Sequence, residues 1–207
     1  MHAPHPAPGA AQPRSCAAPA AFARRVLAAL AALAWASLCD VASAQDSLTP
    51  SSVFLQFGTA TNTTHEAAVG LTWDWRRHWG FGSGRLGGYW EGSISQWSYP
   101  AMDERSTATL SQVGVIPVFR YRPDDGGSPW FAEAGVGLTL TTTLYETDQK
   151  KFSSSFNFGD HLAVGRNFGN ARTQEVALRV EHFSNAGIKR PNPGENFLQL
   201  RYAYRFR

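Results

Sequence analysis

The sequence predicts an all-β protein, an eight-stranded antiparallel transmembrane β-barrel. Three observations favour this fold class. From Leu48 onward, segments of about ten residues alternate between apolar and other side chains and are separated by turn-rich stretches, which is the pattern of barrel strands. A secretory leader precedes these segments. Nothing after the leader approaches the roughly 18 consecutive apolar residues of a spanning helix.

The first 44 residues are predicted to be a signal peptide with an N-terminal extension. Two arginines precede an apolar run, Val26 to Leu38, and the A-x-A sequence Ala42-Ser43-Ala44 follows it. The mature chain is therefore expected to begin near Gln45, with residues 45–207 forming the barrel. Lipid attachment at Cys39 is the competing interpretation, but Leu38 is a bulky residue at a position where lipoprotein signals have a small one.

Cysteine content and charge exclude several classes of protein. Both cysteines, Cys16 and Cys39, fall in the predicted leader, so the mature chain cannot rely on disulfides or thiolate metal sites. The leader also holds three arginines and one aspartate, which leaves the 19 basic and 16 acidic residues of the full sequence nearly balanced in the mature part. No basic run indicates nucleic acid, and no His/Asp/Glu grouping has the spacing of zinc ligands. We therefore predict no nucleic-acid partner, no metal and no other cofactor.

Alternation identifies the first four strands. The second is the clearest, because apolar residues at the odd positions from 67 to 75 alternate with Gly70, Thr72 and Asp74. In the third, Trp90 and Ile94 share one face, and Glu91 lies on the other. The four predicted strands are Val53–Phe57, Ala67–Trp75, Leu86–Gln96 and Val113–Tyr121.

The remaining four strands complete an even number, as bacterial single-chain barrels require. In the fifth, Phe131, Glu133 and two glycines alternate with two alanines, Val136 and Leu138, so the small and polar groups are expected to face a narrow interior. A soluble β-sandwich or lipocalin-like barrel would also alternate, but it would turn its polar side outward. The four strands are Trp130–Leu140, Phe156–Phe168, Gln174–Ser184 and Phe197–Phe206.

Connectivity predicts which end of the barrel faces the cell exterior. Both termini of an even-stranded barrel lie on the periplasmic side, so the seventh strand should end at the cell surface. Compact Gly/Pro turns alternate along the chain with loops near Asn62, Asp103 and Tyr145–Lys151, which agrees with this orientation. The end of the seventh strand would then lie where the outer leaflet's head groups meet its acyl chains.

That strand end carries a candidate hydrolytic site. Residues Val176–Ser184 alternate, so His182 and Ser184 share the lipid-facing side of the strand. Two such residues lie near enough for His182 to accept the Ser184 proton and so activate the hydroxyl as a nucleophile. Glu195, just past a Pro-Asn-Pro-Gly turn, is predicted to return beside His182 as its acidic partner. Asp160, on the other neighbouring strand, is the alternative.

Two further considerations complete the predicted site. Backbone N–H groups and the side-chain amide within Asn185–Gly187 are the candidates for stabilising an oxyanion, since glycine allows tight backbone geometry there. His-x-Ser is a common sequence. A polar pair at a lipid-facing strand end costs free energy, however, so a functional role is expected for it. The other mature-chain histidines are expected in surface loops or turns (His65, His78) and in the barrel interior or rim (His161).

The stretches Glu181–Ile188 and Pro191–Gly194 resemble the PagL family of outer-membrane lipid A 3-O-deacylases, as do Gly114–Tyr121 and Phe156–His161. The resemblance runs through most of the chain after the leader. It implies an outer-membrane barrel whose substrate is the ester at position 3 of lipid A, the membrane anchor of lipopolysaccharide. His182 and Ser184 match the family's base and nucleophile, Glu195 looks like its acidic partner, and Asn185 and Gly187 are similar to the oxyanion-stabilising positions.

Two other functions remain as alternatives. An outer-membrane phospholipase would also require a His-x-Ser pair that faces lipid. Such enzymes use a larger barrel and bound calcium, and this chain is too short for that barrel. A non-enzymatic structural barrel or adhesin should have long loops rich in binding residues, whereas the loops here are short. The sequence decides neither the preferred acyl chain nor whether the barrel forms a homodimer.

Overall fold

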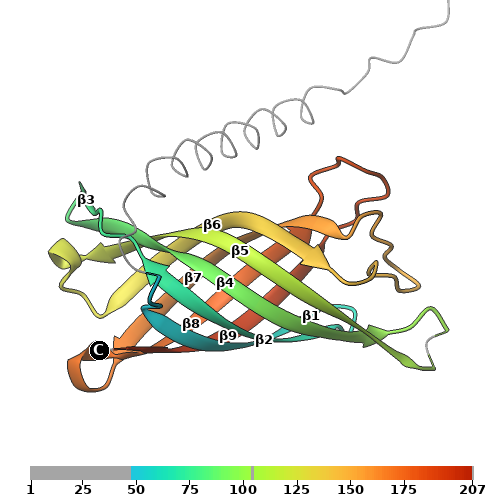
Figure 1. Cartoon of the computed structure of the whole chain (residues 1–207), viewed down its shortest axis with the longest axis horizontal. Helices are drawn as coiled ribbons and strands as arrows, with labels where there is room; N and C mark the ends of the chain where they lie inside the picture. Colours follow the sequence, from blue (N-terminus) through green and yellow to red (C-terminus); the bar gives the residue numbers. More distant parts are fainter. Residues whose placement is uncertain (1–47, 104, 207) are drawn as a thin grey trace, which may run out of the picture.

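The structure, a computed structural model, describes residues 48–103 and 105–206 (Figure 1). The predicted signal peptide, its cleavage site and both cysteines lie outside the described residues. Within those residues, no helix is both long and apolar enough to cross a membrane. The two helical turns that the described chain contains are short 3-10 helices at Asp124–Gly126 and Asn170–Arg172.

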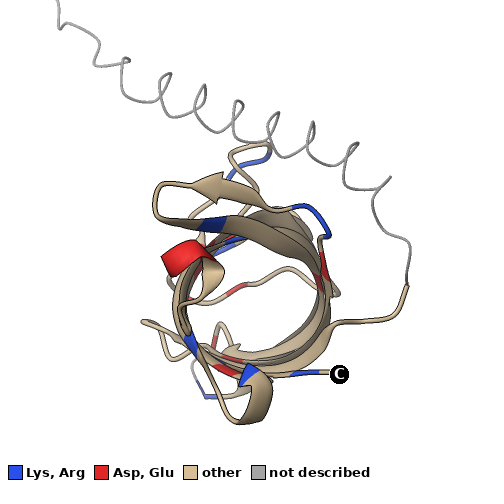
Figure 2. Cartoon of the chain, turned by 90° about the vertical axis from the view of Figure 1, so that its left-hand side faces the viewer, with Lys and Arg blue, Asp and Glu red and all other residues tan. Residues whose placement is uncertain are grey.

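A closed antiparallel barrel is the architecture of the described chain. The strands follow the order β2-β1-β9-β8-β7-β6-β5-β4-β3, and β4 also pairs with β2, which closes the ring. Figure 2 shows this ring end-on. Because β3 pairs with β4 alone, eight of the described strands form the barrel, and the predicted fold class is confirmed. The strands are β1 (Ser52–Ala60), β2 (His65–Asp74), β3 (Trp79–Phe81), β4 (Gly84–Pro100), β5 (Thr107–Pro123), β6 (Trp130–Thr141), β7 (Phe156–Phe168), β8 (Gln174–Ser184) and β9 (Glu195–Arg205).

The strands differ from the predicted segments chiefly in β3, β4 and β5. The short strand β3 folds back on the start of β4 and was not predicted. Strands β4 and β5 extend well past the predicted Leu86–Gln96 and Val113–Tyr121, and their register continues to the pair Pro100 and Thr107. Serine, threonine and glutamine are frequent in these extensions, so apolar alternation does not reveal them.

Both the start of β1 and the end of β9 lie at one end of the barrel, which we call the terminal end (Figure 1). Four connections lie at the opposite end, which we call the loop end. They are residues 61–64, 101–106, 142–155 and 185–194. Strand β8, the predicted seventh strand, runs toward the loop end and finishes there at Ser184.

Inward and outward side chains alternate as the sequence predicts. Along β8, the outward residues Val176, Leu178 and Val180 are 41% to 54% exposed, whereas the intervening Ala177 and Arg179 are at most 4% exposed. Apolar side chains on the outside of a barrel are unfavourable in contact with water, whereas lipid chains can solvate them. The outer wall therefore fits a membrane, and the polar side chains fill the interior.

The barrel interior is a network of paired charges. Arg179 donates from both terminal nitrogens to the two carboxylate oxygens of Glu91, at 3.1 and 3.0 Å, and Arg201 contacts the same carboxylate. Closer to the terminal end, Arg120 pairs with Glu133 and with Glu175. All three carboxylates are buried, so each depends on its arginine partners for stabilisation.

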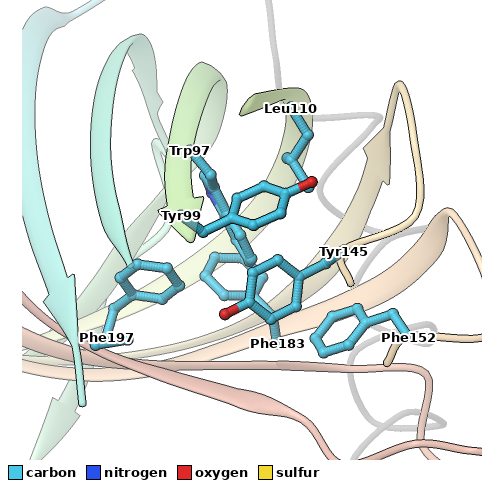
Figure 3. Packing of buried hydrophobic residues seen from close by; sticks show 8 residues of the cluster. Trp97, Tyr99, Leu110, Tyr145, Phe152, Phe183 and Phe197 are labelled. Atoms are coloured by element: carbon cyan, nitrogen blue, oxygen red, sulfur yellow. The ribbon is translucent and has the colours of Figure 1, made fainter. Parts of the chain in front are cut away.

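Aromatic side chains fill the interior at the loop end (Figure 3). The ring of Trp97 lies 5.0 Å from that of Phe183 and 4.7 Å from that of Phe197. Tyr145 and Phe152 come from the connection between β6 and β7 and pack into the same cluster. Residues 142–155 are therefore tied to the inner sides of β8 and β9, directly behind the predicted site.

Candidate active site

Three side chains form a row across the outer surface of the barrel at the loop end. Strand pairing sets Asp160 of β7 opposite His182 of β8, and His182 opposite Asn196 of β9. Directly opposite residues on adjacent strands have Cβ atoms about 5 Å apart. The histidine is thus flanked on one side by a carboxylate and on the other by an amide.

The His182 ring is held by Asn196 and Gly194. Its Nδ1 lies 2.7 Å from Oδ1 of Asn196. A carbonyl oxygen only accepts, so Nδ1 carries the proton and donates it, and Nε2 is left free to act as a base. A Cβ atom on Gly194 would lie 2.5 Å from Cε1 and 3.1 Å from Nε2 of the ring, so the backbone of Gly194 touches the ring edge that carries the free nitrogen.

Ser184 lies one row further toward the loop end on the same outer face as His182. On β7, Ser184 pairs with Phe158. On the other side, the last register pair of β8 and β9 is Phe183 with Glu195, so the next residue of β8, Ser184, lies opposite Gly194. Nε2 of His182 therefore lies toward the row of Ser184. No hydrogen bond joins the described side chains of His182 and Ser184.

Glu195 does not reach His182. Its side chain points into the barrel and is fully buried. One carboxylate oxygen accepts a hydrogen bond from the Tyr145 hydroxyl at 2.9 Å, and the other accepts from Nζ of Lys150 at 2.7 Å. Burial raises the pKa of the Tyr145 hydroxyl, so this group remains a donor. The expected placement of Glu195 beside the histidine is thus corrected, because adjacent residues on a strand point to opposite faces and Asn196 takes the outward position.

Asp160, the alternative acidic residue, is on the correct face. It is half-buried, and its Oδ1 atom is buried without a hydrogen-bond partner among the described residues. Asp160 is the register partner of His182, but the described side chains of these two residues form no ion pair within 4 Å. The structure therefore brings Asp160 near the histidine without a direct contact.

Asn185 organises the backbone that follows Ser184. Its buried Nδ2 donates to Oγ of Ser153 and Ser154 at 3.2 and 3.0 Å and to the carbonyl oxygen of Lys189 at 2.9 Å. Its Oδ1 accepts from the N–H of Gly187 at 3.0 Å. Neither the side-chain amide of Asn185 nor the Gly187 N–H is thus free in this state to bind an oxyanion.

Ala186 presents a backbone donor that the loop leaves unused, two residues after Ser184. Its N–H has no acceptor in the described part of the chain. Its φ of 52° is in the left-handed region, which non-glycine residues seldom adopt, and Gly187 follows with a φ of 78°. Consecutive residues of this kind can direct N–H groups toward an anion. Strained backbone of this kind is typical of functional sites.

The other histidines that the structure describes lie apart from this row. His65 is exposed at the loop-end start of β2, and His78 is exposed near the terminal end. His161 is buried in the interior next to Glu181. In the described part of the chain, no group of three or more His, Cys, Asp or Glu side chains could hold a metal ion.

The alternation of the last strand already indicates that Asn196 faces outward. The outward positions of the last strand are the even ones, such as Leu198 and Leu200, so Asn196 belongs to the outward set and Glu195 to the inward set. Glu195 was predicted as the partner of His182 because triads generally use a carboxylate at this position.

The sequence and the fold both match known proteins of one family. Residues 65–205 match the family described as Lipid A 3-O-deacylase (PagL). The chain belongs to the PagL family. It is 36% identical over 169 residues to the Lipid A deacylase PagL of Bordetella bronchiseptica, which covers 80% of this chain and 89% of that protein. It is 36% identical over 174 residues to the Lipid A deacylase PagL of Pseudomonas aeruginosa, which covers 84% of this chain and 94% of that protein.

A solved PagL structure has the same fold. The crystal structure of the outer membrane enzyme PagL superposes with a TM-score of 0.64 at 31% sequence identity, covering 75% of this chain and 99% of that chain. The closed barrel with an apolar outer wall is thus the PagL fold, and the chain is an outer-membrane protein.

Proposed function

We propose that this member of the PagL family is a lipid A 3-O-deacylase, with Ser184 as nucleophile and His182 as base. The observation that carries the proposal is that His182 and Ser184 share the outer face of β8, while Asn196 bonds Nδ1 of His182 and leaves Nε2 without a hydrogen-bond partner among the described residues. Membership of the PagL family and similarity to two proteins named lipid A deacylases support the substrate. The face on which the row lies supports a lipid substrate that never leaves the membrane.

The first half of the reaction transfers the acyl chain to the enzyme. Ser184 Oγ attacks the ester carbonyl carbon while its proton passes to Nε2 of His182. The carbonyl oxygen becomes an oxyanion, and we assign the Ala186 N–H as a donor to it, since this group is unpaired and two residues from the nucleophile. When the intermediate collapses, the bond to the sugar oxygen breaks, and His182 returns the proton to that oxygen.

The second half of the reaction regenerates the serine. A water molecule attacks the acyl-serine carbonyl carbon and gives a proton to Nε2 of His182. Breakage of the bond to Oγ releases a free fatty acid, and the proton returns to Ser184. The balance is one ester and one water converted to one alcohol and one carboxylic acid, with no cofactor required.

The location of the site suggests how substrate reaches it. Ser184 and His182 open to the lipid-facing wall at the loop end, beside apolar neighbours such as Phe158 and Leu198. We propose that export removes residues 1–44 and that the loop end faces outward. The sugar head group of an outer-leaflet lipid A would then lie at the level of Ser184, with its acyl chains along the barrel wall.

The proposal is tested by mass spectrometry of lipid A after incubation with purified enzyme. Ser184→Ala and His182→Ala should each abolish loss of the 3-O-linked chain, and the double variant should match either one, because parts of one catalytic unit do not act additively. Ser98→Ala and His65→Ala are matched controls, since these residues form a register pair at the loop end of β2 and β4. Release of fatty acid by Ser184→Ala at the wild-type rate would refute the proposal, and release from phospholipid alone would indicate a phospholipase.

A further inference from the structure

The residue that holds the catalytic histidine is uncharged. In a Ser/His/acid triad, one carboxylate does two things: it fixes the orientation and tautomer of the imidazole, and it stabilises the imidazolium that forms when the serine proton is taken. Asn196 is bonded to Nδ1 of His182 at 2.7 Å and can do the first. An amide carries no charge, so Asn196 does little for the second.

A carboxylate is nevertheless present on the other side of the ring. Asp160 occupies the register position opposite His182 on β7. Its buried Oδ1 has no hydrogen-bond partner among the described residues, and its outward neighbours on the strand are Phe158 and Leu162. A carboxylate in such surroundings is costly and calls for a functional explanation.

Other charges are poorly placed to stabilise the ring. On the described outward faces of β7, β8 and β9, the titratable groups other than His182 and the terminal-end tyrosines are Asp160 and Arg166, and Arg166 lies toward the terminal end. The carboxylates of Glu181 and Glu195 face the interior. Lys189 and Arg190 of the following loop are exposed and of the wrong sign. Asp160 is therefore the nearest negative charge on the side of the wall where the reaction takes place.

We propose that the support a triad takes from one acid is divided here between two positioning residues on the strands either side of His182. Asn196 fixes the ring with Nε2 directed toward Ser184, and Asp160 supplies the negative charge that stabilises the imidazolium. The inference rests on the proposed function, since it assigns the two residues through the histidine that acts as base.

The division has a consequence for the pH dependence of the rate. The histidine must be neutral to accept the serine proton, so the rate falls on the acidic side as the ring becomes protonated. This fall is the acidic limb of the pH–rate profile. A carboxylate near an imidazole generally favours the protonated form of the ring. Removal of the Asp160 charge should therefore move the limb to lower pH, and addition of a charge at Asn196 should move it to higher pH.

The experiment measures kcat and KM on lipid A in detergent across the pH range in which histidine titrates. Asp160→Asn should lower kcat and move the acidic limb to lower pH by roughly half a unit or more. Asn196→Asp should retain activity and move the limb upward. Asn196→Ala should lower kcat by about 10²-fold with little change in KM, because the ring is no longer held. Glu146→Gln removes a charge from a loop-end ion pair with Lys151 and should leave the limb in place.

The outcomes separate this inference from the proposed function. If Ser184→Ala is inactive but Asp160→Asn lowers the rate equally at all pH values, the serine mechanism stands and the role of Asp160 is refuted. Nitrogen NMR of the His182 ring gives a readout that does not need activity, since the wild type should carry its neutral proton on Nδ1 and Asn196→Ala should lose that preference. An unchanged tautomer in Asn196→Ala would refute the role of Asn196.

Discussion

At the scale of single residues, the site depends on how closely the backbone approaches the histidine. Gly194 has a φ of 68° and lies against the edge of the His182 ring. Glycine is suited to this position for two reasons, because it adopts the left-handed conformation without strain and because it has no side chain to displace the ring. The hydrogen bond to Asn196 and the contact with the Gly194 backbone restrict the movement of the ring from two different sides.

Replacement of Gly194 by alanine is expected to disable the site without unfolding the barrel. The added Cβ would lie 2.5 Å from Cε1 of His182, so the ring must move away from Ser184. We expect kcat to fall at least about tenfold, since small misplacements of catalytic groups have large effects on rate. Gly82→Ala is the control, because Gly82 also has a positive φ but no atom within 4 Å of the added Cβ. Equal kcat values for the two variants would contradict the prediction.

At the scale of elements, the connection between β6 and β7 is attached to the strand that carries Asn196. Glu195, at the start of β9, binds Tyr145 and Lys150 of that connection inside the barrel. The adjacent residue on the opposite face is Asn196, and its backbone N–H also donates to Glu195 at 3.1 Å. Glu195 therefore joins the loop to the site strand, and its effect on the histidine is indirect.

Removal of the Glu195 carboxylate should loosen this connection more than it impairs catalysis. Glu195→Ala leaves a buried hydroxyl and an ammonium group without their acceptor, at a cost of about 1–3 kcal/mol. We expect faster tryptic cleavage after Lys150 and Lys151, with activity well above that of Ser184→Ala. Glu146→Ala, which removes an exposed ion pair in the same loop, should change little. Abolished activity with the loop still protected would instead support Glu195 as the acidic partner.

At the scale of the whole molecule, the barrel is stabilised from inside by paired charges, since its outer wall faces lipid. Glu91 accepts hydrogen bonds from both Arg179 and Arg201 near the centre of the interior. These groups join β4, β8 and β9 across the barrel. Such pairs are sensitive to the loss of one partner, because the remaining charges stay buried without compensation.

Neutralising Glu91 should destabilise the barrel while leaving the chemistry of the folded enzyme unchanged. Glu91→Gln leaves the charges of Arg179 and Arg201 facing each other, and we expect a loss of about 3–5 kcal/mol in the free energy of unfolding. The urea concentration at which the folded gel band disappears measures this. Adding Arg179→Met should recover part of the loss, whereas Leu178→Ala on the outer wall should have a small effect. Greater instability of the double variant would contradict the charge-pair explanation.

Local pattern was enough to predict the fold class and to place the two candidate catalytic side chains on the outer wall. Alternation with a period of two depends only on neighbours in the sequence, so it identified eight barrel strands and set His182 and Ser184 outside. It also failed for a local reason at the loop-end parts of β4 and β5, where polar residues occupy positions on both faces.

The surroundings of the histidine were decided only by the tertiary structure. Which residues adjoin His182 depends on the register of β7, β8 and β9, and a shift of one residue along a strand carries a side chain through the wall. Glu195 and Asn196 are neighbours in the sequence, yet one binds Tyr145 inside the barrel and the other holds the His182 ring outside it. Asp160 is distant in the sequence and comes beside the ring because β7 pairs with β8.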